Sequence, residues 1–362
     1  MQNYEQKSHR DTAVVLPKVN AHTQNILRFY RCCPATDSLL LHSARQFPLP
    51  VEPVCQAFFT LRFNLTKSSM AKLLYYILLK PLSLLPLFVL YRLSDLLHLV
   101  LYRLVGFRKK VVLNNLRNAF PEKSEPEIKV IARKFYAHFC DLLIESIRMF
   151  SMPKEEILRR CTVVNPELIE KFAQQGRSLI IAAGHYNNWE LAAVAFGIQE
   201  NYTVVGIYKP LANAFFDQKL QHSRSRFSME MIPKKETKSF FANNTHRLTA
   251  TLFATDQSPA NSYQAYWMRF LNQETGILFG AEKYAREYNF PVVFGKIRKP
   301  RRGHYEMEFT IVEEEPAQAP HGSITQKHTQ LLEALIREAP QYWLWTHKRW
   351  KRQRPEGVVL NG

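Results

Sequence analysis

The sequence predicts an α/β protein with a mixed, mostly parallel central sheet flanked by helices. Short runs of branched apolar residues, typical of buried strands, alternate with stretches at helical spacing in the second half of the chain. Before them, an apolar segment beginning at Met70 predicts an N-terminal hydrophobic membrane-anchor helix. With 362 residues, the chain is long enough for one large core, and we expect one main domain with appendages.

The composition suggests four parts. Residues 1–69 are polar and without periodicity, 70–107 are membrane-anchor or interfacial helices, 108–355 form the main domain and 356–362 are a tail. The role of the first part is not readable from its residues. Its eight Lys or Arg residues would resist translocation, so we hypothesise that Met70 is the native start or that the extension is dispensable.

The apolar segment admits three arrangements. Between residues 73 and 90 the clearly polar side chains are Lys80 and Ser83, and this length suffices to cross about 30 Å of hydrocarbon. Lys80 and Pro81 disfavour a straight span, so a bent helical pair lying in the interface competes with it, and a buried hairpin is the soluble alternative. The basic cluster at 108–110 places the following domain in the cytoplasm.

The net charge and the pattern of cysteines limit the classes of partner and site that we expect for this chain. Lys and Arg outnumber Asp and Glu by 49 to 31, a formal charge of +18, which favours a polyanion such as nucleic acid, an anionic bilayer or an acidic carrier protein. The five cysteines show no metal-knuckle spacing, and their odd number argues against a disulfide framework. A phosphate-cradling Gly-Lys-Ser/Thr loop and a Gly-x-Ser-x-Gly elbow are both absent from the sequence.

The elements follow from periodicity and capping residues. Ser124 and Glu127 predict a capping box that opens a long helix ending near Phe150, and Asn165 with Pro166 opens a shorter one. The remaining strands and helices are predicted from apolar runs and from helical spacing of apolar residues. Strands are predicted over 179–183, 202–208, 249–255, 291–297 and 305–312, and helices over 191–196, 212–226, 276–288 and 324–338.

The first of these strands ends at Gly184 in a polar tip that leads into a helix. Open α/β sheets place ligands at such points. His185 and Glu190 lie there, and on an unbroken helix they would diverge by about 140°, so they meet only if the chain turns between them. Asn187 and Asn188 suit that turn as bend residue and N-cap. The pair then predicts a general base for a hydroxyl or thiol, and the alternative is a surface His beside a helix-capping Glu.

This tip resembles the signature of the glycerolipid and lipid A acyltransferase superfamily, a His followed after four residues by an acidic residue. Asn188-Trp189-Glu190 is most similar to the late acyltransferases of lipid A synthesis, which move a fatty acyl chain from acyl carrier protein to a lipid hydroxyl. The resemblance implies that His185 takes the hydroxyl proton and that Glu190 orients its ring, without a metal or another cofactor. Tyr186 and Asn187 depart from the Phe and small residue that members often carry.

Two further motifs extend the resemblance. Relatives have Tyr-Arg-Pro and then a paired-arginine step, where this chain has Tyr208, Lys209 and Pro210 followed by Arg224 and Arg226. Guanidinium groups suit phosphate oxygens or a developing oxyanion, although a solvated basic helix face is equally typical of such a pattern.

Asp256 and Gln257 follow another predicted strand, at the place where relatives carry Asp and then His or Gln. The resemblance puts Asp256 near the pocket, orienting an arginine or the acceptor head group, and the alternative is a turn-forming Asp.

Basic and aromatic residues gather near the C-terminus. Three tryptophans, Trp343, Trp345 and Trp350, alternate with cations and suit either nucleic acid or a membrane interface, of which we favour the membrane. A Pro-x-x-Trp-x-Trp-x-His ending is also typical of the family and implies packing beside the active site. A second basic group, within 296–302, is a candidate surface for the acidic carrier.

Together these observations predict an acyltransferase at the bacterial inner membrane, with its catalytic domain on the cytoplasmic side. Acyl carrier protein is the expected donor and partner, a lipid A precursor in an anionic bilayer the acceptor, and nucleic acid is not expected as a partner. An ornithine-type aminolipid or a lysophospholipid remains an alternative acceptor. From another class, a non-catalytic membrane-tethered binder of anionic lipid or nucleic acid would carry His185 and Glu190 as structural residues.

Overall fold

A seven-stranded sheet forms the centre of the computed structural model, which describes residues 69–199 and 201–361. Its order is β1-β9-β8-β2-β5-β3-β4, and every neighbouring pair is parallel except the antiparallel pair β8 and β9. The mixed, mostly parallel sheet predicted from the sequence is therefore confirmed. The strands are β1 (Cys161–Val163), β2 (Leu179–Ala183), β3 (Thr203–Tyr208), β4 (Glu230–Pro233), β5 (Thr249–Ala254), β8 (Val292–Arg301) and β9 (His304–Glu313).

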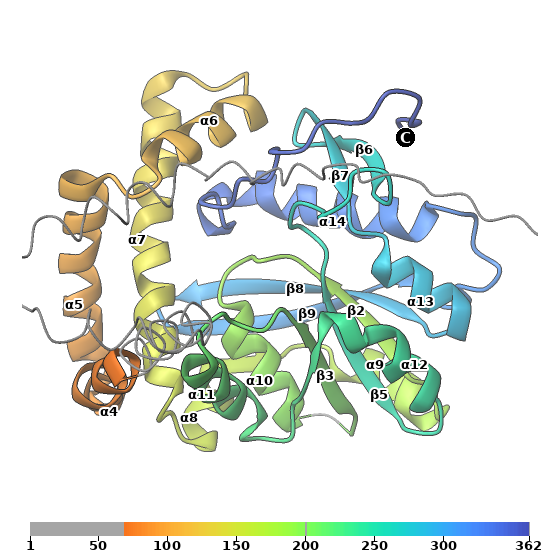
Figure 1. The fold of residues 1–362 in the computed structure, drawn as a ribbon, viewed down its shortest axis with the longest axis horizontal. Coiled ribbons are helices and arrows are strands. Elements are labelled where there is room, and N and C mark those ends of the chain that lie inside the picture. The colour runs from red at the N-terminus through yellow and green to blue at the C-terminus, as the bar shows by residue number, and fades with distance from the viewer. Residues whose placement is uncertain (1–68, 200, 362) are drawn as a thin grey trace, which may run out of the picture. The chain divides into compact units, whose positions relative to one another are not determined.

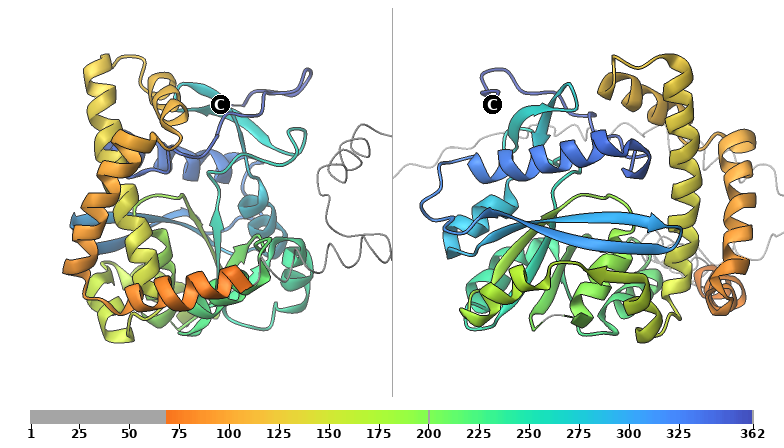
Figure 2. Two further views of the ribbon diagram at one scale, coloured as in Figure 1. Left: turned by 60° about the vertical axis from the view of Figure 1, so that its left-hand side comes forward. Right: turned by 180° about the vertical axis from the view of Figure 1, so that it is seen from behind.

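Helices cover both faces of this sheet (Figures 1 and 2). Apolar side chains of α8 (Lys154–Arg160), α9 (Pro166–Gln174) and α10 (Trp189–Gln199) form one core cluster with the sheet. Those of α13 (Gly280–Tyr288) and α14 (Ser323–Glu338) form another with its opposite face. Two more helices, α11 (Ala214–Ser225) and α12 (Thr237–Asn243), follow β3 and β4. This alternation of strand and helix buries the continuous apolar runs of the central strands.

The long helix predicted after Ser124 is α7 (Glu125–Met149). Ser124 and Glu127 form the expected capping box, and the Glu127 carboxylate accepts the backbone N–H of Ser124 at 2.8 Å. The preceding helix is α6 (Lys109–Ala119). In Figure 1, α7 lies beside α5 (Leu87–Leu99), one of the helices of the apolar segment.

That apolar segment forms a bent helical pair. The chain is helical up to α4 (Lys80–Leu84), including a π-helical stretch over Leu74–Leu79, and breaks at Leu85, which precedes Pro86 and is extended (ψ 146°). A second helix then runs through α5 and a π-helical stretch to Gly106, which is left-handed (φ 62°). Among the described residues, none of the helices has the length and apolarity to cross a bilayer.

The two sides of the bent pair differ in burial. Tyr75, Leu87 and Leu90 are buried, whereas most of the exposed large apolar side chains in the described part of the chain lie between Met70 and Phe107. They include Met70, Leu73, Ile77, Leu84, Phe88, Leu96, Leu104 and Val105. The predicted extension, apart from Ser69, lies outside the described residues.

Four strands were not predicted from the sequence. β1 and β4 are edge strands of three and four residues, too short to show a period. β6 (Tyr266–Phe270) and β7 (Gln273–Ile277) form a separate hairpin, joined by Leu271 and Asn272 with φ of 49° and 63°. The helix predicted over 276–288 is wrong at its start, because residues 276 and 277 belong to β7 and α13 begins at Gly280.

Candidate active site

The polar tip after β2 is a tight turn held from several sides. A side chain at Gly184 would meet Leu332 of α14, with a Cβ only 2.7 Å from its Cδ1, which explains the glycine. Asn187 is left-handed (φ 52°), a conformation that asparagine tolerates well. Its side-chain amide donates to the Ile297 carbonyl at 2.7 Å, and its backbone N–H donates to the Tyr342 carbonyl at 2.9 Å. The predicted role of Asn187 as the bend residue is confirmed.

Asn188 joins the turn to α10 and to α7. Its side-chain oxygen accepts the backbone N–H of Leu191 at 2.9 Å, so it is the predicted N-cap. Its amide donates to Glu145 at 2.6 Å. Glu145 is 2% exposed and also accepts the hydroxyls of Tyr91 at 2.8 Å and Tyr305 at 2.7 Å. Burial raises the pKa of Glu145.

His185 is bound by Asp256. Its Nδ1 lies 2.6 Å from Asp256 Oδ1, and its backbone N–H donates to Oδ2 at 2.8 Å. The Trp343 indole donates to the same Oδ2 at 2.8 Å. Parallel strands β2 and β5 explain the pairing, because Ala183 is the partner of Ala254 and each site residue comes two positions later. Asp256 was expected to orient an arginine or the acceptor head group, with a turn-forming Asp as the alternative, whereas in the structure its carboxylate holds His185 and Trp343.

The opposite charges of protonated His185 and ionised Asp256 stabilise each other. Burial is the largest influence on the pKa of His185 and lowers it, but the charge and hydrogen bond of Asp256, aided by the charge of Glu190, raise it above its usual 6.5. Burial raises the pKa of Asp256, but its contacts with His185 and Trp343 outweigh this and lower it to about 2. Asp256 is therefore ionised near neutral pH, and Nδ1 of His185 carries the proton that it donates.

Glu190 has a different partner from the one predicted. Its two carboxylate oxygens accept from Arg224 at 2.7 and 2.6 Å, a bidentate ion pair between α10 and α11. The ring nitrogens of His185 instead contact Asp256 and Gln257. The expectation that Glu190 orients the ring is wrong, because the helix begins at Trp189 and its first turn faces α11. Trp189 packs edge-on against the imidazole, with ring centroids 5.0 Å apart.

The other predicted binding residues separate into two groups. Arg224 belongs to the site through Glu190, and it also influences the pKa of Tyr208 at the end of β3, which burial and Asp217 raise. Arg226 lies elsewhere and donates to the carbonyls of Met149 and Met152, near the C-terminal end of α7. Cations are favoured at helix C-termini, so Arg226 is explained by structure. Lys209 is exposed.

Two of the three C-terminal tryptophans are core residues, and Trp350 is partly buried against the same core. Trp343 and Trp345 are 2% and 0% exposed and pack edge to face with centroids 4.7 Å apart. Their predicted place at a membrane interface is therefore wrong, whereas packing beside the candidate site is confirmed by the bond of Trp343 to Asp256. Ser258 donates its backbone N–H to Nε2 of His347 at 3.0 Å, and burial lowers the pKa of His347 to about 4.

The basic group at 296–302 is largely paired within the chain. Lys299 is almost buried and bonds to Asp141. Partly exposed pairs join Lys296 to Glu338, Arg298 to Glu308 and Arg302 to Asp95, and Arg302 also bonds to the buried Asp141. These carboxylates offset much of the positive charge that made the group a candidate carrier surface.

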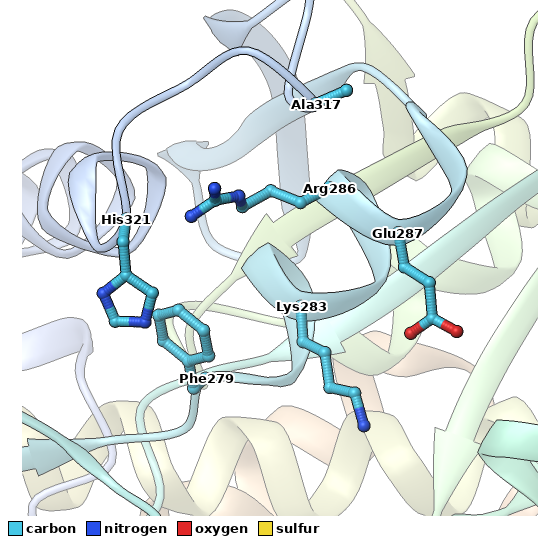
Figure 3. A pocket seen from close by; sticks show the side chains of 6 residues that line it. All are labelled: Phe279, Lys283, Arg286, Glu287, Ala317 and His321. Carbon is cyan, nitrogen blue, oxygen red and sulfur yellow. The ribbon is translucent and has the colours of Figure 1, made fainter.

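A hollow on the surface, of about 440 Å³, lies away from this turn. Figure 3 shows Lys283, Arg286 and Glu287 projecting from α13 around it, with His321 beside Phe279. The lining residues do not include His185, Asp256 or Glu190.

Comparison with known proteins identifies the family of this chain. The family model of bacterial lipid A biosynthesis acyltransferases matches residues 58–352, a range that contains every residue of the site described above. The chain is also similar to the lipid A biosynthesis lauroyltransferase of Escherichia coli (strain K12), with 27% identity over 275 residues, which cover 76% of this chain and 89% of that protein. The chain therefore belongs to the bacterial lipid A biosynthesis acyltransferase family.

Proposed function

We propose that this acyltransferase moves a fatty acyl chain from a thioester on acyl carrier protein to a hydroxyl of a lipid A precursor, with His185 as general base. Family membership and the similarity to a lauroyltransferase support an acyltransferase of lipid A. One observation carries the mechanism: His185 Nδ1 is held at 2.6 Å by a buried, ionised carboxylate, which leaves Nε2 as the proton acceptor.

The reaction needs one proton relay. As the acceptor hydroxyl oxygen attacks the thioester carbonyl carbon, Nε2 of His185 takes its proton, and Asp256 stabilises the imidazolium that forms. The tetrahedral intermediate then expels the thiolate of the donor, which takes the proton back from His185. The products are an ester of the acceptor and a free thiol. His185 ends the cycle neutral.

Arg224 is proposed to bind an anionic group of the acceptor or the developing oxyanion. Its guanidinium side chain is 21% exposed and its partner Glu190 is 27% exposed, so both are reachable from solvent. A guanidinium fork suits a phosphate bidentately, and Glu190 would hold that fork in place before the acceptor arrives. Tyr208, close enough to respond to the charge of Arg224, completes this side of the proposed site.

The bent helical pair is proposed to attach the enzyme to the cytoplasmic face of the inner membrane. Phe88 and Leu96 of α5 are 72% and 58% exposed, as expected for side chains that enter a lipid interface. Residues 103–134, which follow the pair in the sequence, contain nine Lys or Arg and three Glu. This excess of positive charge favours binding to anionic lipid. Tyr91 of α5 donates to Glu145, which in turn accepts from Asn188 of the catalytic turn, so a single side chain connects the attached helix to that turn.

Substitution of His185 by Ala tests the catalytic assignment. Purified enzyme, acyl-loaded carrier protein and a lipid A precursor would be incubated, and the lipid product would be identified by mass spectrometry. We expect transfer to fall by about 10² or more. His246→Ala, at an exposed histidine of the loop before β5, is the matched control and should retain activity. Undiminished transfer by His185→Ala would refute the assignment, and acylation of an aminolipid or lysophospholipid in its place would redirect the acceptor.

Membrane attachment has its own test. Phe88→Asp with Leu96→Asp should abolish co-sedimentation with vesicles that contain anionic phospholipid, since two charges would enter the interface. Val359→Asp changes a 69%-exposed apolar residue outside the bent pair and should leave binding intact. Equal binding by both variants would reject the attachment surface.

A further inference from the structure

Two consecutive residues hold both nitrogens of the His185 ring. Asp256 contacts Nδ1 at 2.6 Å, and the side-chain amide nitrogen of Gln257 lies 3.1 Å from Nε2. The second contact occupies the atom that must accept a proton from the attacking hydroxyl.

The protonation states follow from the donor inventory. Nδ1 faces an ionised carboxylate and so carries a hydrogen, which leaves a lone pair on Nε2 of the neutral ring. The Gln257 amide N–H donates to that lone pair. An imidazolium would set an N–H against this amide, so the contact belongs to the neutral ring and favours it.

We propose that Gln257 is a gate on the catalytic base, which keeps Nε2 occupied until the acceptor lipid displaces it and thereby restrains hydrolysis of the acyl donor. This proposal rests on the proposed function of His185. Gln257 thus determines which hydroxyl compound reacts, the lipid or water.

The side reaction uses the same relay. Water attacks the thioester carbonyl carbon while Nε2 of His185 takes one of its protons, the carbon–sulfur bond breaks, and the thiolate recovers the proton. The products are a free fatty acid and the carrier thiol. The side chain of His185 is 16% exposed, so solvent has access to the ring.

Either nucleophile must first break the Gln257 contact, but they compensate for it differently. A sugar hydroxyl arrives on a large head group with further oxygens, which can accept the displaced amide N–H and hold it. A single water molecule supplies no such fixed acceptor. Displacement therefore penalises water more than the acceptor.

The backbone on both sides of Gln257 is fixed, so the gate moves by side-chain rotation. Thr255 donates its backbone N–H to the Ala183 carbonyl at 3.0 Å, and Ser258 donates to Nε2 of His347 at 3.0 Å. Asp256 between them is bonded to His185 and Trp343. Rotation of the glutamine side chain leaves the Asp256–His185 pair intact.

Gln257→Leu and Gln257→Asn test the gate, since the first removes the donor and the second shortens its reach. Release of fatty acid from acyl-loaded carrier protein would be measured without acceptor, at a pH where His185 is neutral. We expect hydrolysis to rise roughly fivefold, with transfer to acceptor rising less or falling. Gln326→Leu removes a glutamine donor bonded to Tyr266 at 2.7 Å and should leave hydrolysis unchanged. Structural damage alone would lower both reactions.

The pH profile gives a second readout. Loss of a contact made only by the neutral ring should raise the pKa of His185, so the acid limb of the transfer rate should move up by roughly 0.7 pH unit in Gln257→Leu. Gln257→Glu, which places a carboxylate beside Nε2, should move it further up. A downward shift, or hydrolysis that falls in step with transfer in both variants, would overturn the gate.

His185→Ala distinguishes failure of the Gln257 gate from failure of the proposed role of His185 as general base. If that substitution leaves transfer intact, the proposed function of His185 fails. If it abolishes transfer and hydrolysis while the Gln257 variants behave like Gln326→Leu, only the gate is wrong.

Discussion

Two acidic residues flank the candidate base and lie in different surroundings. Asp256 is 3% exposed, bonds to His185 and Trp343, and has a pKa lowered to about 2. Glu190 is 27% exposed and pairs with Arg224. Glu190 is the nearer of the two in sequence, yet the sheet brings Asp256 into contact with the ring. A motif in sequence thus identifies the residues of a site without fixing which of them touch.

The difference between the two carboxylates predicts unequal roles. A buried carboxylate in a low-dielectric site interacts strongly with an imidazolium, whereas a solvent-screened ion pair contributes less. In the proposed mechanism, Asp256 would therefore orient the base, and Glu190 with Arg224 would bind the acceptor.

Asp256→Asn should give the largest effect, a fall in transfer of roughly 10²–10⁴. Asp256 raises the pKa of His185 against burial, so the acid limb of the rate should move to lower pH in the variant. The folded-state pKa of Asp256 is about 2 against the usual 3.8, so its stabilisation of the fold is complete above pH 3.8 and is lost as pH falls through 2. A pH series of transfer rates and of urea unfolding checks both statements. A wild-type profile in Asp256→Asn would contradict the assignment.

Trp343→Phe should have an intermediate effect. It removes a donor to an ionised oxygen, which is worth about 1.5–3 kcal/mol of unfolding free energy. Trp345→Phe is the matched control, because its indole donates to the neutral carbonyl of Pro340 and about 0.5–1.5 kcal/mol is expected. Urea denaturation of both variants measures the difference, and equal losses would mean that the charge on Asp256 adds nothing at Trp343.

Glu190→Gln and Arg224→Met should give the smallest effect. The pair is partly exposed, so a double-mutant cycle in unfolding free energy should yield a coupling of about 0.2–1 kcal/mol. Glu333 and Arg337, a pair within α14 in which two guanidinium nitrogens donate to one carboxylate oxygen, provide the reference cycle. We expect Glu190→Gln to lower the rate of acyl transfer by up to roughly fivefold. A loss as large as that of Asp256→Asn would reverse the ranking of the two carboxylates.

Much of the fold was predictable because the central strands are continuous apolar runs. β2 was predicted with its observed bounds, and β3, β5, β8 and β9 within a few residues. The edge strands β1 and β4 were missed because three or four residues carry no period, and β6 with β7 because Leu271–Asn272 is not a recognised turn pair. A bent helical pair was among the arrangements weighed because of Lys80 and Pro81, but the structure places the bend at Leu85 and Pro86, where the residue before proline is extended.

The site was predictable only in part. The motif identified His185, Asn187 and Asn188, whose local roles depend on neighbours within the turn. The partner of His185 depends on strand order, which places β5 beside β2 although β3 and β4 come between them in the chain. A usable signal existed, namely that His185 and Asp256 each come two residues after an apolar strand. Glu145 had no such signal, because one Glu in a long amphipathic helix looks like any other solvated position.

Tyr342 and Trp343 come late in the chain, after every strand of the sheet. The backbone N–H of Asn187 donates to the carbonyl of Tyr342, and Asp256 accepts the indole N–H of Trp343, which lies 87 residues after it in the chain. A chain that ends after β9 would contain every strand of the sheet and would lack the groups that hold the turn at Asn187 and the carboxylate of Asp256. We therefore expect truncation before Tyr342 to loosen the turn that carries His185 while leaving the motif itself in the chain.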